Sequence, residues 1–304
     1  MKTTAYADQL PLVRSRWLDF VELTKPRIGV MVLFTVGLGA LLANPQPLDL
    51  MQLVHTLIGV ALVASGASAL NQWLERDTDA LMRRTDNRPL PSGRLNTGEV
   101  IGFGSALSVS GFVYMACLLT YPLAAVVAGA TLLSYVFVYT PLKRKTTLNT
   151  LIGAVPGALP PVIGWTAMTG RLDGAAIVLF LIVFFWQVPH FLAIAWMYRE
   201  DYARAGLRML PALDADGAVT ARQMLLYAIG LIPISLLPVL FNDAGAMYGF
   251  GAMGLGVYFL RSVWAFAVAP SHTLARKVLL ASLIYLPGVF GSMLLERWVR
   301  YWMT

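Results

Sequence analysis

The chain has 304 residues, of which 58% are hydrophobic and 13% are charged, and its formal net charge is +7 at pH 7. This composition places it among membrane proteins. Basic loops beside anionic lipid explain the positive charge without a nucleic-acid partner. The single cysteine, Cys117, excludes an internal disulfide and a thiolate metal cluster.

The N-terminal segment, about 1–25, is polar and of mixed charge. It lacks an apolar stretch followed by a small-residue cleavage site, so we expect no secretory signal peptide. It is also a poor match to a mitochondrial presequence, which is rich in Arg and Ser and poor in acids. We therefore expect a bacterial inner membrane and a cytoplasmic N-terminus.

Nine apolar runs of membrane-spanning length follow in the chain. They lack the alternation of a membrane β-barrel, so helices are expected to satisfy the backbone polar groups in lipid. The prediction is an all-α polytopic membrane protein with a single domain over 1–304. The predicted spans are 28–43, 51–74, 98–119, 121–139, 150–168, 174–197, 223–241, 245–266 and 277–295.

The distribution of basic residues supports this topology. With a cytoplasmic N-terminus, nine spans place the C-terminus in the periplasm, and all but three of the 23 Lys and Arg fall on the cytoplasmic side. The positive-inside rule predicts this asymmetry. The three exceptions are Arg171, Arg297 and Arg300.

The end of the second span carries an unusual row of polar residues. Asn71, Glu75 and Asp79 recur every four positions, so on a helix they share one face, whereas Asp77 points away from it. Mg²⁺ prefers carboxylate and carbonyl oxygens and is usually shared with substrate phosphates. The spacing therefore predicts a site for a magnesium-bound polyphosphate.

Arginines follow the acids directly. A guanidinium group matches phosphate oxygens with two hydrogen bonds, and Arg83, Arg84 and Arg88 suit that role. The alternative is a solvated helix end, whose acids pair with Arg83 and Arg84 about one turn away.

Two further basic clusters are expected on the same membrane face. Lys25 and Arg27 precede the first span, and Lys143 begins a basic run, 143–145, after the fourth. Each cluster alone also fits an anchor of the positive-inside kind. Their shared placement beside the acids favours a pyrophosphate site.

The sixth span contains a histidine, His190, about two turns before its end. A titratable group at that depth is costly and often functional, so it could bind a metal, accept a proton or contact a substrate. The alternative is that a neighbouring helix satisfies it. After this span, Asp201 could add a second metal contact, or the pair Glu200 and Asp201 could bind Arg199 or Arg204.

Taken together, these segments resemble the UbiA-type intramembrane prenyltransferases, and within them the haem O synthase (protoheme IX farnesyltransferase) family. The motif Asn71-x₃-Glu75-x₃-Asp79 followed by Met82-x-Arg84-Thr85-x₂-Arg88-Pro89 matches the aspartate-rich motif of the superfamily. The narrower similarity covers nearly the whole chain in order. It rests on the motifs at 23–27, 143–146, 157–164, 186–190 and 201–206.

The resemblance implies nine helices around a central cavity, with the active site toward the cytoplasm. It implies transfer of the farnesyl group of farnesyl diphosphate to a vinyl group of haem b with addition of water, giving haem O and pyrophosphate. It also implies a possible link to terminal oxidase assembly proteins. By this similarity Asn71, Glu75 and Asp79 hold Mg²⁺, Asp201 belongs to a second acidic motif and His190 faces the porphyrin. The residues that would bind diphosphate are Lys25, Arg83, Arg84, Arg88, Lys143 and Arg208.

The chain departs from the family pattern at three places. Glu75 stands where relatives more often have Asp, Glu200 and Asp201 are adjacent rather than four apart, and Arg208 replaces a more usual Pro. A UbiA-type enzyme with another acceptor remains an alternative. So do a secondary transporter, which would carry its polar groups nearer the midplane, and a haem-carrying assembly factor.

Overall fold

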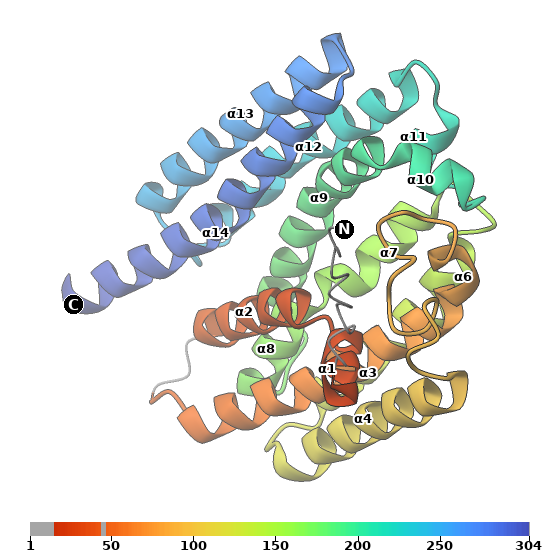
Figure 1. The fold of residues 1–304 in the computed structure, drawn as a ribbon. Coiled ribbons are helices and arrows are strands. Elements are labelled where there is room, and N and C mark those ends of the chain that lie inside the picture. Colours follow the sequence, from red (N-terminus) through yellow and green to blue (C-terminus); the bar gives the residue numbers. More distant parts are fainter. Residues whose placement is uncertain (1–14, 44–46, 304) are drawn as a thin grey trace, which may run out of the picture.

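The computed structural model describes residues 15–43 and 47–303, and in these ranges the chain is helical and contains no strand. Within these described ranges, nine segments are long and apolar enough to cross a membrane, which confirms the predicted all-α, multi-pass architecture (Figure 1). Most of the predicted N-terminal segment lies outside the described residues. The spans are α2 (Pro26–Ala43), α3 (Leu50–Asp79), α4 (Thr97–Leu118), α5–η1–α6 (Leu123–Leu133, Ser134–Tyr139, Thr140–Leu142), α7–α8 (Asn149–Ala158, Pro160–Thr169), α9 (Gly174–Met197), α12 (Ala218–Leu240), α13 (Ala246–Val268) and α14 (His272–Met303).

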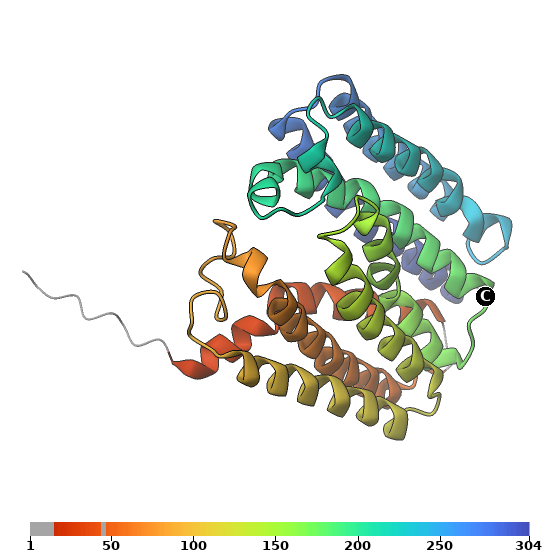
Figure 2. The same ribbon diagram turned by 90° about the vertical axis from the view of Figure 1, so that its right-hand side faces the viewer.

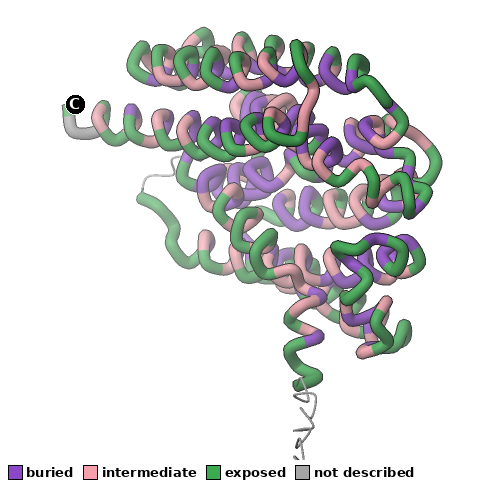
Figure 3. The backbone as a smooth tube through the Cα atoms, turned by 45° about the horizontal axis from the view of Figure 1, so that its top comes forward, coloured by how far each residue is buried: buried purple, intermediate pink, exposed green. Residues whose placement is uncertain are grey.

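The helices form two packed groups, which α9 connects. In one group α3 packs on α4 and α2 packs on α8. In the other, α12 and α14 pack on α9, α13 packs on α12 and α14, and α9 also contacts α7 (Figures 1 and 2). The outward sides of the helices are exposed and the inward sides buried (Figure 3). Large apolar side chains on that outward surface, such as Val109, Ile229 and Phe250, suit contact with lipid.

The α7–α8 span lies in the interior of the bundle, since 72% of its apolar window is buried. Prolines break this span at Leu159, where α7 ends and α8 begins. A β-carbon on Gly164 would collide with the carbonyl oxygen of Val36, and one on Gly39 would collide with that of Pro161. The glycines therefore let α2 and α8 approach backbone to backbone.

One end of the bundle gathers the charged segments, and we call it the charged face. It is the end at which α3, α6 and α9 terminate, at Asp79, Leu142 and Met197. With 30 residues, α3 is about 45 Å long and exceeds the hydrocarbon thickness of a bilayer. The short helices α10 (Arg199–Arg204) and α11 (Leu210–Leu213) cover this face, whereas the C-terminus lies at the opposite end (Figure 1).

Candidate functional site

The predicted row on α3 faces the interior at the charged face. Asn71 and Asp79 are each 1% exposed and Glu75 is 9% exposed. Asp77 points the other way, because its side chain is 66% exposed and pairs with Arg76 at 3.4 Å. The spacing of four thus selects the three inward residues, as predicted.

Each member of the row contacts a basic side chain from a different segment. The acids do not pair with Arg83 and Arg84, so the interpretation as a self-paired helix end does not hold for these acids. The three contacts are Lys25 Nζ to Asn71 Oδ1 at 2.8 Å, Lys143 Nζ to Glu75 Oε1 at 2.6 Å and Arg88 Nη1 to Asp79 Oδ2 at 2.6 Å.

An unusual backbone conformation delivers Lys25 to this cluster. Its φ of 49° lies in the left-handed region, which is strained for a residue with a β-carbon. Pro26 follows and begins α2, so the chain turns sharply between α1 (Arg16–Leu23) and α2. Burial, helped by the charge of Arg88, lowers the pKa of Lys25 to about 7, although Glu75 opposes the shift.

Lys143 enters from the end of the fourth span. The π-helical segment η1 precedes it, and its ammonium group lies 4.6 Å from the centre of the Tyr139 ring. Burial disfavours the charge, but the Glu75 carboxylate outweighs burial and raises the pKa of Lys143 well above its usual value. From the same segment, Thr140 accepts a hydrogen bond from Asn71 Nδ2 at 3.1 Å and so orients the amide.

The donor set of this cluster fits a magnesium ion. Asp79 Oδ1 is buried and has no hydrogen-bond partner among the described residues, so one carboxylate oxygen remains available. The described residues contain no group of three or more His, Cys, Asp or Glu side chains able to hold a metal. An ion held by Glu75, Asp79 and the Asn71 amide would thus need water or phosphate oxygens as further ligands, which is typical of Mg²⁺.

The other predicted polar residues near this end lie on the rim of the charged face and do not contact Glu75 or Asp79. Arg84 stacks over the rings of Tyr198 and Tyr202, at 4.6 and 5.6 Å. Asp201 pairs with Arg204 at 3.1 Å, as the alternative interpretation of that segment expected. The last two of these predicted residues are Arg83, which lines a pocket at the end of α9, and Arg208, which donates to the Lys145 carbonyl at 3.3 Å.

His190 lies deeper in the bundle, on the side of α9 that contacts α14. Its Nδ1 is 2.7 Å from the hydroxyl of Ser282, which itself donates to the Leu279 carbonyl at 2.6 Å. With the hydroxyl proton donated to Leu279, Ser282 accepts from Nδ1–H, and in that tautomer a neutral His190 carries a lone pair on Nε2. Trp186 stacks on the imidazole at 4.8 Å and donates to the Ser282 carbonyl at 2.7 Å, which fixes the plane of the ring.

Sequence reasoning identified His190 but not its partner. Ser282 lies 92 positions away, on a helix that only the fold brings near. A lone hydroxyl within an apolar run was the available signal, and it is too common to be specific. Thr140 was not assigned a role either, although it lies only three positions before Lys143, which begins the basic run.

The fold and sequence of the chain match one family of membrane enzymes. A structure described as digeranylgeranylglyceryl phosphate synthase in membranes superposes with a TM-score of 0.77 at 17% identity, covering 92% of this chain and 98% of that one. A UbiA homologue from Archaeoglobus fulgidus bound to GPP and Mg²⁺ gives a TM-score of 0.63 at 13% identity, covering 90% of this chain and 99% of that one.

Sequence relatives share far more identity. A protoheme IX farnesyltransferase of Solibacter usitatus is 50% identical over 92% of this chain and 98% of its own length. One of Koribacter versatilis is 44% identical over 94% and 96%. The model of the UbiA prenyltransferase family matches residues 32–286. The chain therefore belongs to the UbiA prenyltransferase family.

Proposed function

We propose that this prenyltransferase moves the farnesyl group of farnesyl diphosphate to a vinyl group of haem b, with water added, to give haem O and pyrophosphate. The observation that carries the proposal is the buried cluster on α3, in which Lys25, Lys143 and Arg88 surround the acids. Such a cluster suits a leaving diphosphate. The choice of acceptor rests on the relatives, which are named protoheme IX farnesyltransferase at 41–50% identity.

The chain's own residues would stabilise the leaving group. As the allylic C–O bond breaks, its electron pair goes to the diphosphate, and the cations at Lys25, Arg88 and Lys143 neutralise the developing charge. Fixed charges in a site shielded from water act strongly because they need not reorganise during the reaction. A Mg²⁺ ion held by Asn71, Glu75 and Asp79 would supply further positive charge to the phosphate oxygens.

The acceptor then completes the reaction. The π electrons of the vinyl group form the new C–C bond with the farnesyl carbon, which leaves a cation beside the porphyrin ring. The oxygen of a water molecule bonds to that carbon and a proton is released, so the product carries a hydroxyl group. The lone pair on His190 Nε2 suits the acceptance of that proton.

We infer that the charged face is cytoplasmic and that the membrane is the bacterial inner membrane. The support is the positive-inside rule, since Lys and Arg concentrate on that face. The C-terminus, at the opposite end of the bundle, would then be periplasmic.

The test is release of pyrophosphate by purified enzyme from farnesyl diphosphate and Mg²⁺, with and without haem b, together with mass analysis of the haem. We expect release to depend on haem b and to match the haem O formed. Release that requires an aromatic or quinone precursor instead, with no haem O, would refute the assigned acceptor. Haem binding without any release would point to a carrier.

A further inference from the structure

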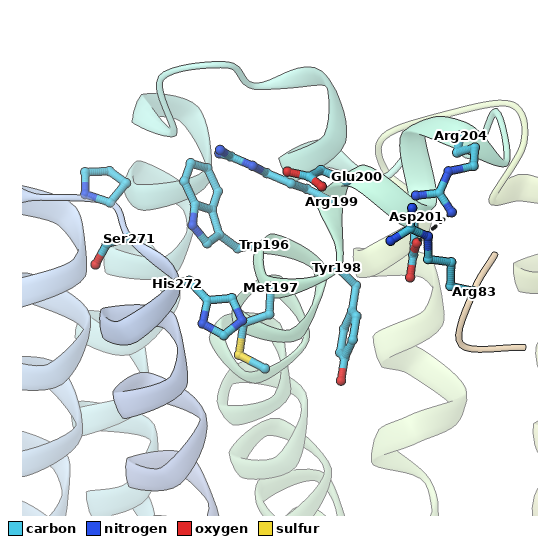
Figure 4. A pocket seen from close by; sticks show the side chains of 11 residues that line it. Arg83, Trp196, Met197, Tyr198, Arg199, Glu200, Asp201, Arg204, Ser271 and His272 are labelled. Atoms are coloured by element: carbon cyan, nitrogen blue, oxygen red, sulfur yellow. Dashed lines mark ion pairs between the residues drawn. The ribbon is translucent and has the colours of Figure 1, made fainter.

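A pocket on the rim of the charged face, which we call the rim pocket, is lined by none of the residues of the acid cluster. The acid cluster consists of Asn71, Glu75 and Asp79 with their partners Lys25, Lys143 and Arg88. The rim pocket has a volume of about 430 Å³ and lies where α9 ends, α10 follows and α14 begins (Figure 4). Arg83 reaches it from the segment after α3, so both halves of the bundle contribute to its wall. Its charged lining residues are three arginines (Arg83, Arg199 and Arg204) and two acids (Glu200 and Asp201), and Trp196 and His272 also line it.

Two of the three arginines that line this pocket, Arg83 and Arg199, form no ion pair with a carboxylate among the described residues. Asp201 pairs with Arg204, which compensates that guanidinium. The guanidinium carbon of Arg199 instead lies over the indole of Trp196, 4.3 Å from the ring centre. No ion pair joins it to a carboxylate in the part of the chain that the structure describes. Stacking preorganises the guanidinium and leaves its edge free to donate, which is the arrangement that binds a carboxylate with two hydrogen bonds.

The pocket lies at the end of the interface between α9 and α14. His190 lies in the same interface, deeper in the bundle. Trp196 follows His190 by six positions on α9, a rise of about 9 Å. On α14, His272 precedes Ser282 by ten positions, a rise of about 15 Å. The same two helices therefore present a basic pocket at the rim and, deeper in the bundle, an imidazole with a free lone pair. A flat, largely apolar ligand with acidic groups along one edge matches both features.

We propose that the rim pocket binds the two propionate carboxylates of the haem acceptor, with Arg199 as the principal donor. This assignment rests on the proposed function, because it is the haem b acceptor that carries these groups. In haem b the vinyl groups lie on the side of the ring away from the propionates. Anchoring the acidic edge at the rim thus directs the reactive edge into the bundle. The pocket sets the orientation of the acceptor and excludes flat ligands that lack acids.

The test compares haem b with its dimethyl ester, in which both carboxylates are masked. Binding is followed by the absorbance of haem titrated into the full-length enzyme in detergent, and farnesyl transfer is measured on the same samples. We expect the wild type to bind haem b at least tenfold more tightly than the ester. Arg199→Gln should weaken haem b binding by about 10- to 100-fold and leave the ester nearly unaffected, since charged hydrogen bonds are lost only with the acid.

Two matched variants make the comparison specific. Arg199→Lys keeps the charge but loses the planar fork, so its effect on haem b binding should be intermediate. Arg222→Gln removes an exposed arginine from the first turns of α12, outside the pocket, and should bind both ligands like the wild type. The KM for farnesyl diphosphate should stay unchanged in Arg199→Gln, which also reports that this variant is folded.

Equal binding of haem b and its ester by the wild type would overturn the pocket assignment, as would equal weakening of both in Arg199→Gln. Either result combined with haem O formation would leave the proposed function intact. Conversely, binding that depends on the carboxylates and on Arg199, without farnesyl transfer, would support the pocket and refute the proposed function.

Discussion

Replacing Glu75 with Gln tests the acid cluster most directly. The substitution keeps the shape of the side chain but removes the negative charge that lies 2.6 Å from Lys143. If Glu75 helps to hold a divalent ion against the diphosphate, its loss removes one fixed electrostatic contact. Such contacts contribute about 10²- to 10³-fold to kcat, or about 3–4 kcal/mol. We therefore expect pyrophosphate release to fall by at least about 100-fold.

The same change also affects stability, and the two effects must be separated. The side chains of Glu75 and Lys143 are 12% and 17% exposed, so Glu75→Gln leaves a largely buried ammonium group unpaired. Breaking a buried pair in this way costs about 3–5 kcal/mol. The double variant Glu75→Gln/Lys143→Met removes both charges and should recover much of the lost thermal stability. It should not recover activity, because the metal ligand and a diphosphate contact are both missing.

The assay is pyrophosphate release at saturating Mg²⁺, with thermal unfolding in detergent measured on each variant. Asp77→Asn is the matched control on the same helix, since Asp77 is exposed and faces away from the cluster. Its release should stay within about twofold of the wild type, whereas Asp79→Asn should resemble Glu75→Gln. The reasoning fails if Asp77→Asn is as damaging as Asp79→Asn, or if the double variant regains turnover together with stability.

Four further outcomes are expected. Ser282→Ala should lower farnesyl transfer about 10- to 100-fold and alter its pH profile, because the His190 ring loses the partner that fixes its tautomer. Chelation of divalent ions should abolish pyrophosphate release, and added Mg²⁺ should restore it. Gly164→Ala should lower the Tm in detergent, since a methyl group would meet the α2 backbone. Burial tends to raise the pKa of Asp214, but hydrogen bonds from Thr220 outweigh it and lower that pKa. Asp214→Asn should thus cost about 1 kcal/mol near neutral pH, and in unfolding scans the difference from the wild type should vanish as acid protonates the native carboxyl.

The spans and the acid row could be predicted because both depend on local periodicity. Apolar length identifies a span regardless of its neighbours, and a spacing of four places Asn71, Glu75 and Asp79 on one face of any helix. The partners of those residues depend on how the loops run. Arg83 and Arg84 are nearer to Asp79 in sequence, yet Arg88 forms the ion pair, because the segment after α3 folds back on itself.

Longer-range contacts were beyond the reach of sequence patterns. The pairing of His190 with Ser282 requires α9 and α14 to be neighbours, and no motif encodes that adjacency. The rim pocket is a similar case. Trp196 lies at the end of α9 and Arg199 begins α10, so the two are close in sequence, but His272 joins them only because α14 begins beside them in the fold. When several helices form a site, sequence patterns therefore predict the residues on the helix that carries the motif. They do not predict the residues that other helices contribute.

The charge balance of the acid cluster explains why Lys143 and Arg88 form ion pairs with its acids, Glu75 and Asp79. Lys143 and Arg88 contribute two positive charges, against two negative charges from Glu75 and Asp79, and Lys25, whose pKa burial lowers to about 7, adds part of a third near neutral pH. Mutual pairing keeps this buried site close to neutral before substrate arrives, which limits the cost of burying its charges. A prenyl diphosphate carries up to three negative charges, and a divalent cation brings the protein side to three positive ones when the bound anion holds Lys25 protonated. Substrate and ion together therefore replace one nearly neutral arrangement with another, whereas either alone leaves excess charge in a poorly hydrated site. The cluster should accordingly bind the diphosphate and the metal cooperatively and favour the state in which both are present.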